Sequence, residues 1–204
     1  MSSIIVRDGY DRMGDRFESW AAEIRDDPRD EWRADLCSRL AAGARVLELG
    51  CGRGRDTCVL AERFAVTAVD CSPKMLEHAR RKAPRATFLN SDFTSLDLDD
   101  DSFDAVASFY VFNHVPRGQL APLLRAIHDW LVPGGLLLTA FGTSDTEAWT
   151  GEWLGVPMFF SSFPPERNSQ LAREAGFDIL RDELVTFTEP EGEATFQWIL
   201  ARSI

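Results

Sequence analysis

Several features that would identify other classes of protein are missing from this chain of 204 residues. No apolar run approaches the ~18 residues that a membrane-spanning helix needs, and the first residues lack the apolar stretch of a secretory signal. The four cysteines are Cys37, Cys51, Cys58 and Cys71, and none of them forms a C-x-x-C pair. This spacing argues against a zinc site and against a disulfide framework. We therefore expect a reduced, cytoplasmic protein without a metal cluster, and a single divalent ion bound through substrate oxygens stays open.

Positive charge is also scarce. The chain has 33 acidic and 22 basic side chains, which gives a formal net charge of −11, and most of the acidic excess lies in residues 145–204. Binding to phosphate-rich partners needs a positive field, so we expect neither nucleic acid nor membrane as a partner. The sequence leaves open whether the protein is a monomer or a homodimer.

Short apolar runs alternate with helical patterns, and there is no repeat or low-complexity linker. Strands are predicted at residues 45–49, 65–69, 86–89, 103–109 and 136–141. Strands that are apolar throughout and that alternate with helices are typical of a parallel sheet covered on both faces. We therefore expect an α/β fold.

The rest of the chain is predicted to surround this core. We expect helices over 10–25 and 28–42, a turn-rich aromatic insert at 143–163, a helix over 166–175, and an antiparallel pair of strands at 177–187 and 194–202. A single domain is predicted, with a helical cap (1–44), a cofactor-binding core (45–142), a substrate-cover insert (143–163) and a C-terminal helix with closing strands (164–204).

The sharpest motif is a glycine loop between the first strand and its helix. Gly50, Gly52 and Gly54 remove the Cβ atoms that would keep a ligand away from the backbone, and the N–H groups of the next helix favour anionic or acceptor groups. Twenty residues after Gly50, Asp70 ends the second strand, where a carboxylate can accept both hydroxyls of a ribose. The pair predicts a nucleoside-containing ligand. The alternative is that the glycines only form a tight turn and Asp70 only caps a helix.

Two other nucleotide motifs fit poorly. The dinucleotide pattern G-x-G-x-x-G needs glycine where Arg55 stands, and an arginine there would crowd the pyrophosphate. No G-K-[ST] follows the loop, so a P-loop is excluded.

Four ordered motifs carry a family resemblance. Residues 46–54 resemble motif I of the class I S-adenosylmethionine-dependent methyltransferases. Residues 69–76 resemble the D-x-S-x-x-M-L segment of that family, residues 91–93 its G-D-x step, and residues 131–135 its L-x-P-G-G turn. The resemblance covers residues 10–142 continuously. It implies a Rossmann-like fold with a mostly parallel seven-stranded sheet and an antiparallel last strand. It also implies S-adenosylmethionine as cofactor, with S-adenosylhomocysteine as product.

The resemblance assigns the methionine end of the cofactor to the glycine loop. The residues expected there are Gly50, Cys51, Gly52 and Gly54. Glu48 would fix the loop or the ammonium group of the cofactor, and a purely structural role for Glu48 stays open. Tyr10 resembles the tyrosine of an N-terminal helix that closes over the methionine end.

The same resemblance places the nucleoside end. Asp70 would hold the ribose hydroxyls, Cys71 and Met75 would pack on the adenine, and Asp92 would accept a hydrogen bond from its amine beside Phe93. Each has a plainer alternative: Met75 and Phe93 can be core residues, and Asp92 can cap a turn.

Residues after the fourth strand are predicted to surround the reacting groups. Phe109 and Tyr110 would border the sulfonium, and His114 is the candidate general base. The alternative for His114 is that it orders its loop or touches the cofactor. His78 is expected to be solvated and His128 to be structural.

The aromatic insert is the predicted substrate region. Trp149, Trp153 and Phe160 could form an apolar pocket or stack on a cationic group, and the alternative is a cap that closes the core. The fourth strand also lacks the N/D-P-P-Y/F ending of nucleic-acid amino methyltransferases, which weighs against DNA and RNA.

These observations predict an S-adenosylmethionine-dependent methyltransferase that methylates a small organic molecule by in-line displacement. The acceptor atom, whether O, N, C or S, is not determined. A non-catalytic nucleoside-binding module and a protein methyltransferase remain as alternatives, and Arg55 argues against an NAD-dependent oxidoreductase.

Overall fold

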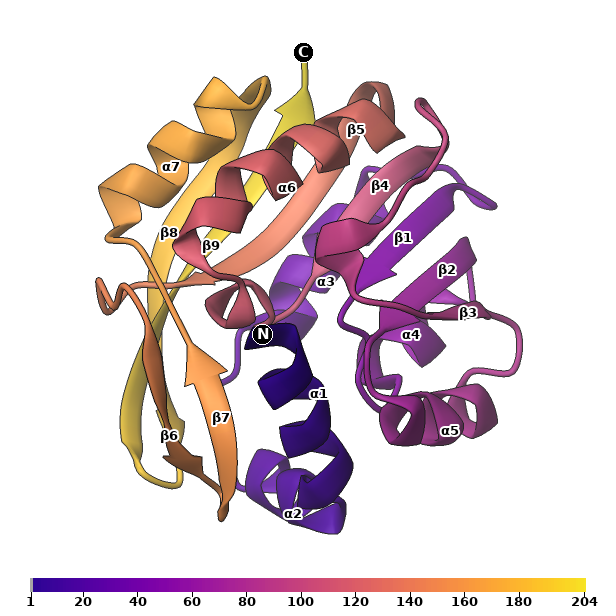
Figure 1. Ribbon diagram of the computed structural model, residues 1–204. Coiled ribbons are helices and arrows are strands. Elements are labelled where there is room, and N and C mark those ends of the chain that lie inside the picture. Colours follow the sequence, from indigo (N-terminus) through magenta and orange to yellow (C-terminus); the bar gives the residue numbers. More distant parts are fainter. Residues whose placement is uncertain (1) are drawn as a thin grey trace.

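The computed structural model describes residues 2–204 and has a seven-stranded sheet (Figure 1). Its strands are β1 (Arg45–Leu49), β2 (Ala65–Asp70), β3 (Thr87–Asn90), β4 (Phe103–Ser108), β5 (Leu131–Gly142), β8 (Phe177–Glu189) and β9 (Gly192–Ser203). The strand order is β3-β2-β1-β4-β5-β9-β8. Strands β1 to β5 are parallel, and β9 is antiparallel to both β5 and β8. The expected Rossmann-like fold with an antiparallel last strand is confirmed.

Helices cover both faces of this sheet. They are α1 (Ser2–Met13), α2 (Asp15–Ala22), α3 (Arg29–Ser38), α4 (Arg55–Leu60), α5 (Pro73–Lys82), α6 (Arg117–Trp130) and α7 (Pro165–Glu174), with 3-10 turns η1 (Phe93–Ser95) and η2 (Phe112–His114). Alternation along β1 sends Leu47 into a core with residues of α6 and α7, and Val46 into a second core with residues of α3, α4 and α5. Both cores fix the sheet, and with it the strand ends that form the site.

The strand order reverses between β1 and β4. From β1 the chain runs outward through β2 to β3, and it then returns to place β4 on the other side of β1. In an open parallel sheet this reversal leaves a crevice beyond the carboxyl ends of the two central strands. The glycine loop after β1 and the Tyr110 segment after β4 both begin at this crevice.

The N-terminal helices differ from their predicted bounds. One helix over 10–25 was expected, but α1 begins at Ser2, and Gly14, with φ of +56°, separates it from α2. Val6 and Met13 of α1 are buried in a small third core with residues 156–159. The apolar face of α1 thus depends on a partner far along the chain, which local sequence patterns do not reveal.

That partner is a hairpin within the aromatic insert. Strands β6 (Trp149–Trp153) and β7 (Val156–Phe160) pair antiparallel, and the turn residues Leu154 and Gly155 both have positive φ. Helix α1 (indigo in Figure 1) lies against β7. A Cβ on Gly9 would come within 2.7 Å of Met158 and 2.9 Å of the Pro157 carbonyl, so the absence of a side chain at Gly9 permits this close packing.

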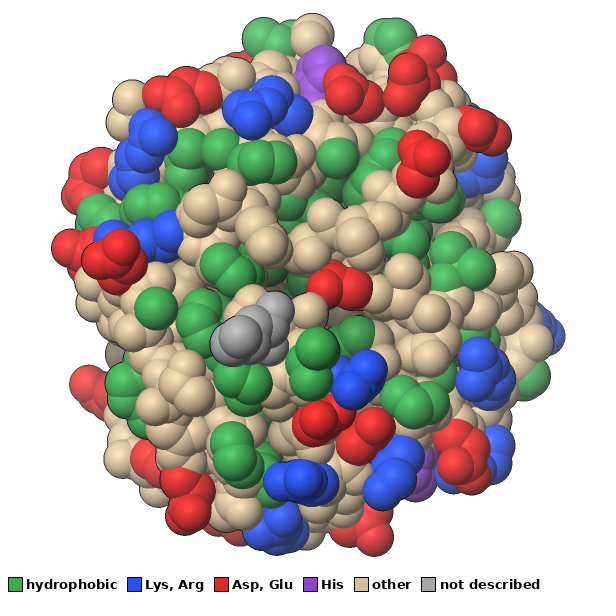
Figure 2. All heavy atoms as spheres, viewed as in Figure 1, with side chains coloured by type: hydrophobic (Ala, Val, Ile, Leu, Met, Phe, Trp, Pro, Cys, Tyr) green, Lys and Arg blue, Asp and Glu red, His purple; other side chains and the backbone are tan. Residues whose placement is uncertain are grey.

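The surface carries charges of both signs. On the face in Figure 2, lysine and arginine side chains are interspersed with aspartate and glutamate, and they do not form a continuous basic patch. Among residues 2–204, no helix is long and apolar enough to cross a bilayer.

Candidate functional site

A cavity of about 360 Å³ opens at the crevice beyond β1 and β4. Most of the residues singled out in the sequence line it: Tyr10, Glu48, Gly50, Cys51, Gly52, Asp70, Cys71, Met75, Asp92, Phe93, Phe109, Tyr110, His114, Trp153 and Phe160. Gly54 and Trp149 are outside this lining. The fold therefore brings together side chains from α1, the sheet and the β6–β7 hairpin.

The glycines of the loop serve different purposes. Gly52 has φ of +51° and a Cβ there would meet no atom within 4 Å, which leaves open space on the cavity side. Gly54 has φ of +77°, and a Cβ on it would approach the Cα of Ala79 to 3.0 Å. Gly54 thus allows the loop to pack on α5, away from the cavity that it was predicted to line.

Asp70 is held in place by the backbone of its neighbours. Its Oδ2 accepts a hydrogen bond from the Gly52 N–H at 2.8 Å, and its Oδ1 accepts one from the Ser72 N–H at 2.8 Å. Burial raises the pKa of Asp70 to about 6. Each carboxylate oxygen has a second lone pair, so the group can still accept hydrogen bonds from a diol in the cavity.

Helix α1 is tied to the start of α5 next to Asp70. Ser72 caps α5 by accepting the Met75 N–H, and its hydroxyl donates to Asp11 of α1. Lys74 Nζ donates to the Asp11 carbonyl at 2.9 Å. These contacts hold α1 over the carboxyl end of β2.

The residues predicted to contact the adenine line the cavity, and they also have the core or capping roles that were the alternatives. Asp92 lines the cavity, and its Oδ1 also accepts hydrogen bonds from the N–H and the hydroxyl of Thr94, so it caps η1. Met75 is buried in the wall of the cavity. Phe93 lines the cavity and also packs against the core beside Phe112.

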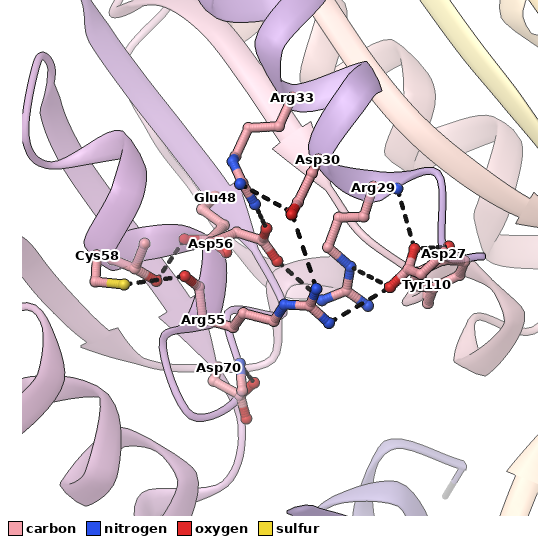
Figure 3. Close-up of polar contacts among 12 residues, drawn as sticks. Asp27, Arg29, Asp30, Arg33, Glu48, Arg55, Asp56, Cys58, Asp70 and Tyr110 are labelled. Atoms are coloured by element: carbon pink, nitrogen blue, oxygen red, sulfur yellow. Dashed lines mark hydrogen bonds and ion pairs between the residues drawn. The ribbon is translucent and has the colours of Figure 1, made fainter. Parts of the chain in front are cut away.

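A charged network that the sequence reasoning missed lies behind the glycine loop (Figure 3). Asp56 of α4 binds Arg29 at 2.9 Å and also binds Arg33, and both arginines belong to α3. The Arg29 guanidinium lies over the Tyr110 ring, 4.7 Å from its centroid. Tyr110 donates a hydrogen bond to Asp27 at 2.7 Å. Together these contacts fix Tyr110 at the end of β4, although its φ is +60°.

Glu48 is buried close to this network. It accepts a hydrogen bond from the Thr57 hydroxyl. Burial, together with the nearby Asp56 carboxylate, raises the pKa of Glu48. Glu48 therefore fixes α4 to β1 and also contributes to the cavity wall.

His114 is held in the cavity wall by contacts at both ring nitrogens. Its Nδ1 lies 2.9 Å from the Phe159 carbonyl, and its Nε2 lies 3.0 Å from the Tyr10 hydroxyl. A carbonyl can only accept, so Nδ1 carries the proton and Nε2 accepts from Tyr10. Burial lowers the pKa of His114 to about 4. His114 is therefore neutral near pH 7, and it also joins η2 to β7.

Aromatic side chains form the walls beyond His114. Trp153 and Phe160 of the hairpin were predicted, whereas Phe17 and Trp20 of α2 were missed. Trp149 is 42% exposed and packs on Phe160 with a centroid separation of 5.7 Å.

The opposite wall comes from the β8–β9 hairpin and was also missed. Phe187 and Phe196 pack around Tyr110 at centroid separations of 5.5 and 4.8 Å. In the sequence these phenylalanines have the same pattern as core strand residues, so no local signal distinguishes them.

The arrangement of the fold and the cavity agrees with the family to which known proteins of similar sequence belong. Residues 46–135 match the family described as "Methyltransferase domain". A methyltransferase of Synechocystis sp. is 30% identical over 157 residues, which cover 71% of this chain and 72% of that relative. The demethylmenaquinone methyltransferase of Clavibacter sepedonicus is 42% identical over 121 residues, 55% of this chain. The chain spans about half, 48%, of that relative's length.

Solved structures show the same fold. The 1,6-didemethyltoxoflavin-N1-methyltransferase of Burkholderia thailandensis, with 1,6-didemethyltoxoflavin and S-adenosylhomocysteine bound, superposes with a TM-score of 0.66 at 25% identity. The match covers 95% of this chain and 87% of that one.

Proposed function

The chain belongs to the class I S-adenosylmethionine-dependent methyltransferases, and we propose that it methylates a small organic molecule by in-line displacement. One observation carries the proposal: a single cavity is lined both by Asp70 and the glycine loop and by His114 and the aromatic walls. A donor held at the loop and an acceptor held between the aromatic side chains would meet inside that cavity.

The chain's own residues fit the cofactor. Gly52 leaves room for a ligand against the backbone, and Asp70 keeps lone pairs for the two ribose hydroxyls. Cys71 and Met75 would pack on the adenine, and Asp92 would accept from its amine. When bound, S-adenosylmethionine supplies an electrophilic methyl group.

Tyr10 and His114 would take up the proton that the acceptor loses. The acceptor's lone pair forms the new bond to the methyl carbon, and the bond to sulfur breaks with its electron pair left on sulfur. The proton of an O–H or N–H acceptor passes to the Tyr10 oxygen as Tyr10 gives its own proton to His114 Nε2. Positioning contributes ~7–11 kcal/mol to such a step, and a base contributes roughly 3–5 kcal/mol. Alignment is therefore the larger contribution, and a weakly basic histidine is sufficient.

The named activities of the similar proteins support a small acceptor. The names of two of these enzymes contain demethylmenaquinone and 1,6-didemethyltoxoflavin, which are small organic molecules. The aromatic walls suit an acceptor with an apolar or aromatic portion.

Radiolabelled methyl transfer into a fractionated cell extract tests the proposal. We expect label from S-adenosylmethionine to enter a small molecule, which is then identified. Asp70→Asn should abolish most of the transfer, whereas Asp99→Asn, a change at an exposed residue, should not. Label found only in protein or nucleic acid, or cofactor binding without any transfer, would contradict it.

A further inference from the structure

Among residues 2–204, the wall of the cavity contains one carboxylate for which the structure shows no partner, that of Glu189. Glu189, the last residue of β8, lines the cavity and is half-buried. Within residues 2–204 its carboxylate accepts no hydrogen bond and forms no ion pair, and the charged groups that act on it are Glu191 and Asp27. Because a half-buried anion is costly unless it is paired, this group is available to a ligand.

The position of Glu189 is fixed by contacts on both sides of it. The preceding residue, Thr188, exchanges two backbone hydrogen bonds with Arg25, at 3.0 and 3.1 Å. Trp20 donates its indole N–H to Glu191 at 2.7 Å. These contacts fasten the tip of the β8–β9 hairpin to the segment around α2, so Glu189 is held at the wall rather than on a free loop.

Arginines in the cavity wall already have carboxylate partners. Arg29 binds Asp56 at 2.9 Å, Arg53 binds Glu18 at 2.9 Å, and Arg55 lies 3.4 Å from Asp27. None of these three is left to receive a carboxylate or phosphate from an acceptor. Lys82 also lines the cavity, but the charged groups that act on Glu189 are both carboxylates. The charge around Glu189 therefore favours a cation.

We propose that Glu189 binds a protonated amine on the methyl acceptor while the aromatic walls enclose the rest of the molecule. The inference rests on the proposed function, since it takes this chamber to be the acceptor site. The amine is an anchor and not the methylated atom, because a protonated nitrogen has no lone pair for attack. Aromatic faces such as those of Trp20 and Phe187 also attract cations.

The electrostatics of Glu189 agree with this role. Burial and the carboxylates of Glu191 and Asp27 raise its pKa to about 6. The group is thus ionised at neutral pH, and a bound cation would offset the repulsion from its neighbours.

Three probes with the same ring system test the inference. Tryptamine, tryptophol and indole-3-propionate carry a cationic, a neutral and an anionic side chain, and their binding to protein saturated with S-adenosylhomocysteine is measured by calorimetry. We expect tryptamine to bind at least about tenfold more tightly than the other two, as suits a charge-assisted hydrogen bond. Glu189→Gln should remove this preference and leave tryptophol binding unchanged. Glu193→Gln, in the exposed part of the same hairpin, should behave like the wild type.

The inference is overturned if tryptamine binds no better than its partners, or if Glu189→Gln weakens all three probes equally. Its failure is separable from failure of the proposed function, because methyl transfer is measured independently. A methylated product without a basic nitrogen would remove the amine anchor and leave the methyltransferase intact. Amine-selective binding without any methyl transfer would contradict the proposed function and leave the amine site at Glu189.

Discussion

At the residue scale, two hydrogen bonds determine what His114 can do. The Phe159 carbonyl fixes the proton on Nδ1, so Nε2 faces Tyr10 with its lone pair available. The same contacts hold η2 against β7 and α1. The alternative that His114 orders its loop is therefore compatible with the proposed proton transfer, and only kinetics can separate the two roles.

His114→Ala should lower kcat by about 10²–10³-fold, because it removes the proton acceptor. Tyr10→Phe should lower kcat to a similar extent if the proton passes through its hydroxyl. Affinity for S-adenosylhomocysteine, measured by calorimetry, should stay within about threefold in both variants. An unchanged kcat in His114→Ala with the natural acceptor would remove this residue from the mechanism. Loss in His114→Ala alone would mean that Tyr10 only positions the imidazole.

The residues that sequence reasoning found share a local signal. Gly52 lies in the loop after β1 and Asp70 is the last residue of β2, and the rules for open sheets place such positions at the ligand. Arg29 and Asp56 were missed because their pairing joins α3 to α4, which a helical pattern does not reveal. Glu189 was missed because only the fold shows that it lines the cavity and that no residue of 2–204 pairs with it.

At the element scale, strands β1 to β4 were predicted to within one residue at each end, whereas β5 and the cap were not. Strand β5 begins at Leu131 and not at residue 136, because Leu131 already pairs with Phe103 ahead of the expected turn. Strand β1 has the predicted bounds, since an apolar run that ends in glycine defines it locally. Helix α1 and the β6–β7 hairpin stabilise each other through Met13 and Met158. The apolar face of each element is explained only by its contact with the other. The start of α1 and the strands of the insert could therefore not be predicted from local patterns.

The β6–β7 hairpin offers a matched pair of tryptophans. Trp153 lines the cavity, whereas Trp149 is largely outside it. Trp153→Ala should raise the KM for the acceptor about tenfold or more by opening the aromatic wall. Trp149→Ala should change this KM much less, and neither variant should weaken cofactor binding comparably. Initial rates over both substrate concentrations give the two constants. A larger effect on the cofactor than on the acceptor would contradict the assignment of the hairpin to the acceptor site.

At the scale of the whole molecule, groups around the cavity titrate in opposite directions. Burial raises the pKa of Asp70 from 3.8 to about 6, so folding favours its protonated form, and the stability associated with this preference is lost as pH rises through that window. Burial lowers the pKa of His114 from 6.5 to about 4, so the unfolded chain binds its proton more readily. His114 therefore destabilises the folded protein as pH falls below 6.5. The stability of the wild type alone cannot separate these contributions.

A comparison of variants isolates the histidine. Between about pH 7.5 and pH 5, linkage predicts that His114 costs the folded state about 2 kcal/mol. In urea denaturation, His114→Asn should therefore lose about 2 kcal/mol less than the wild type over this range. If His114→Asn and the wild type lose equal stability on acidification, His114 is not buried in its neutral form. The protonation state proposed for the catalytic pair would then be wrong as well.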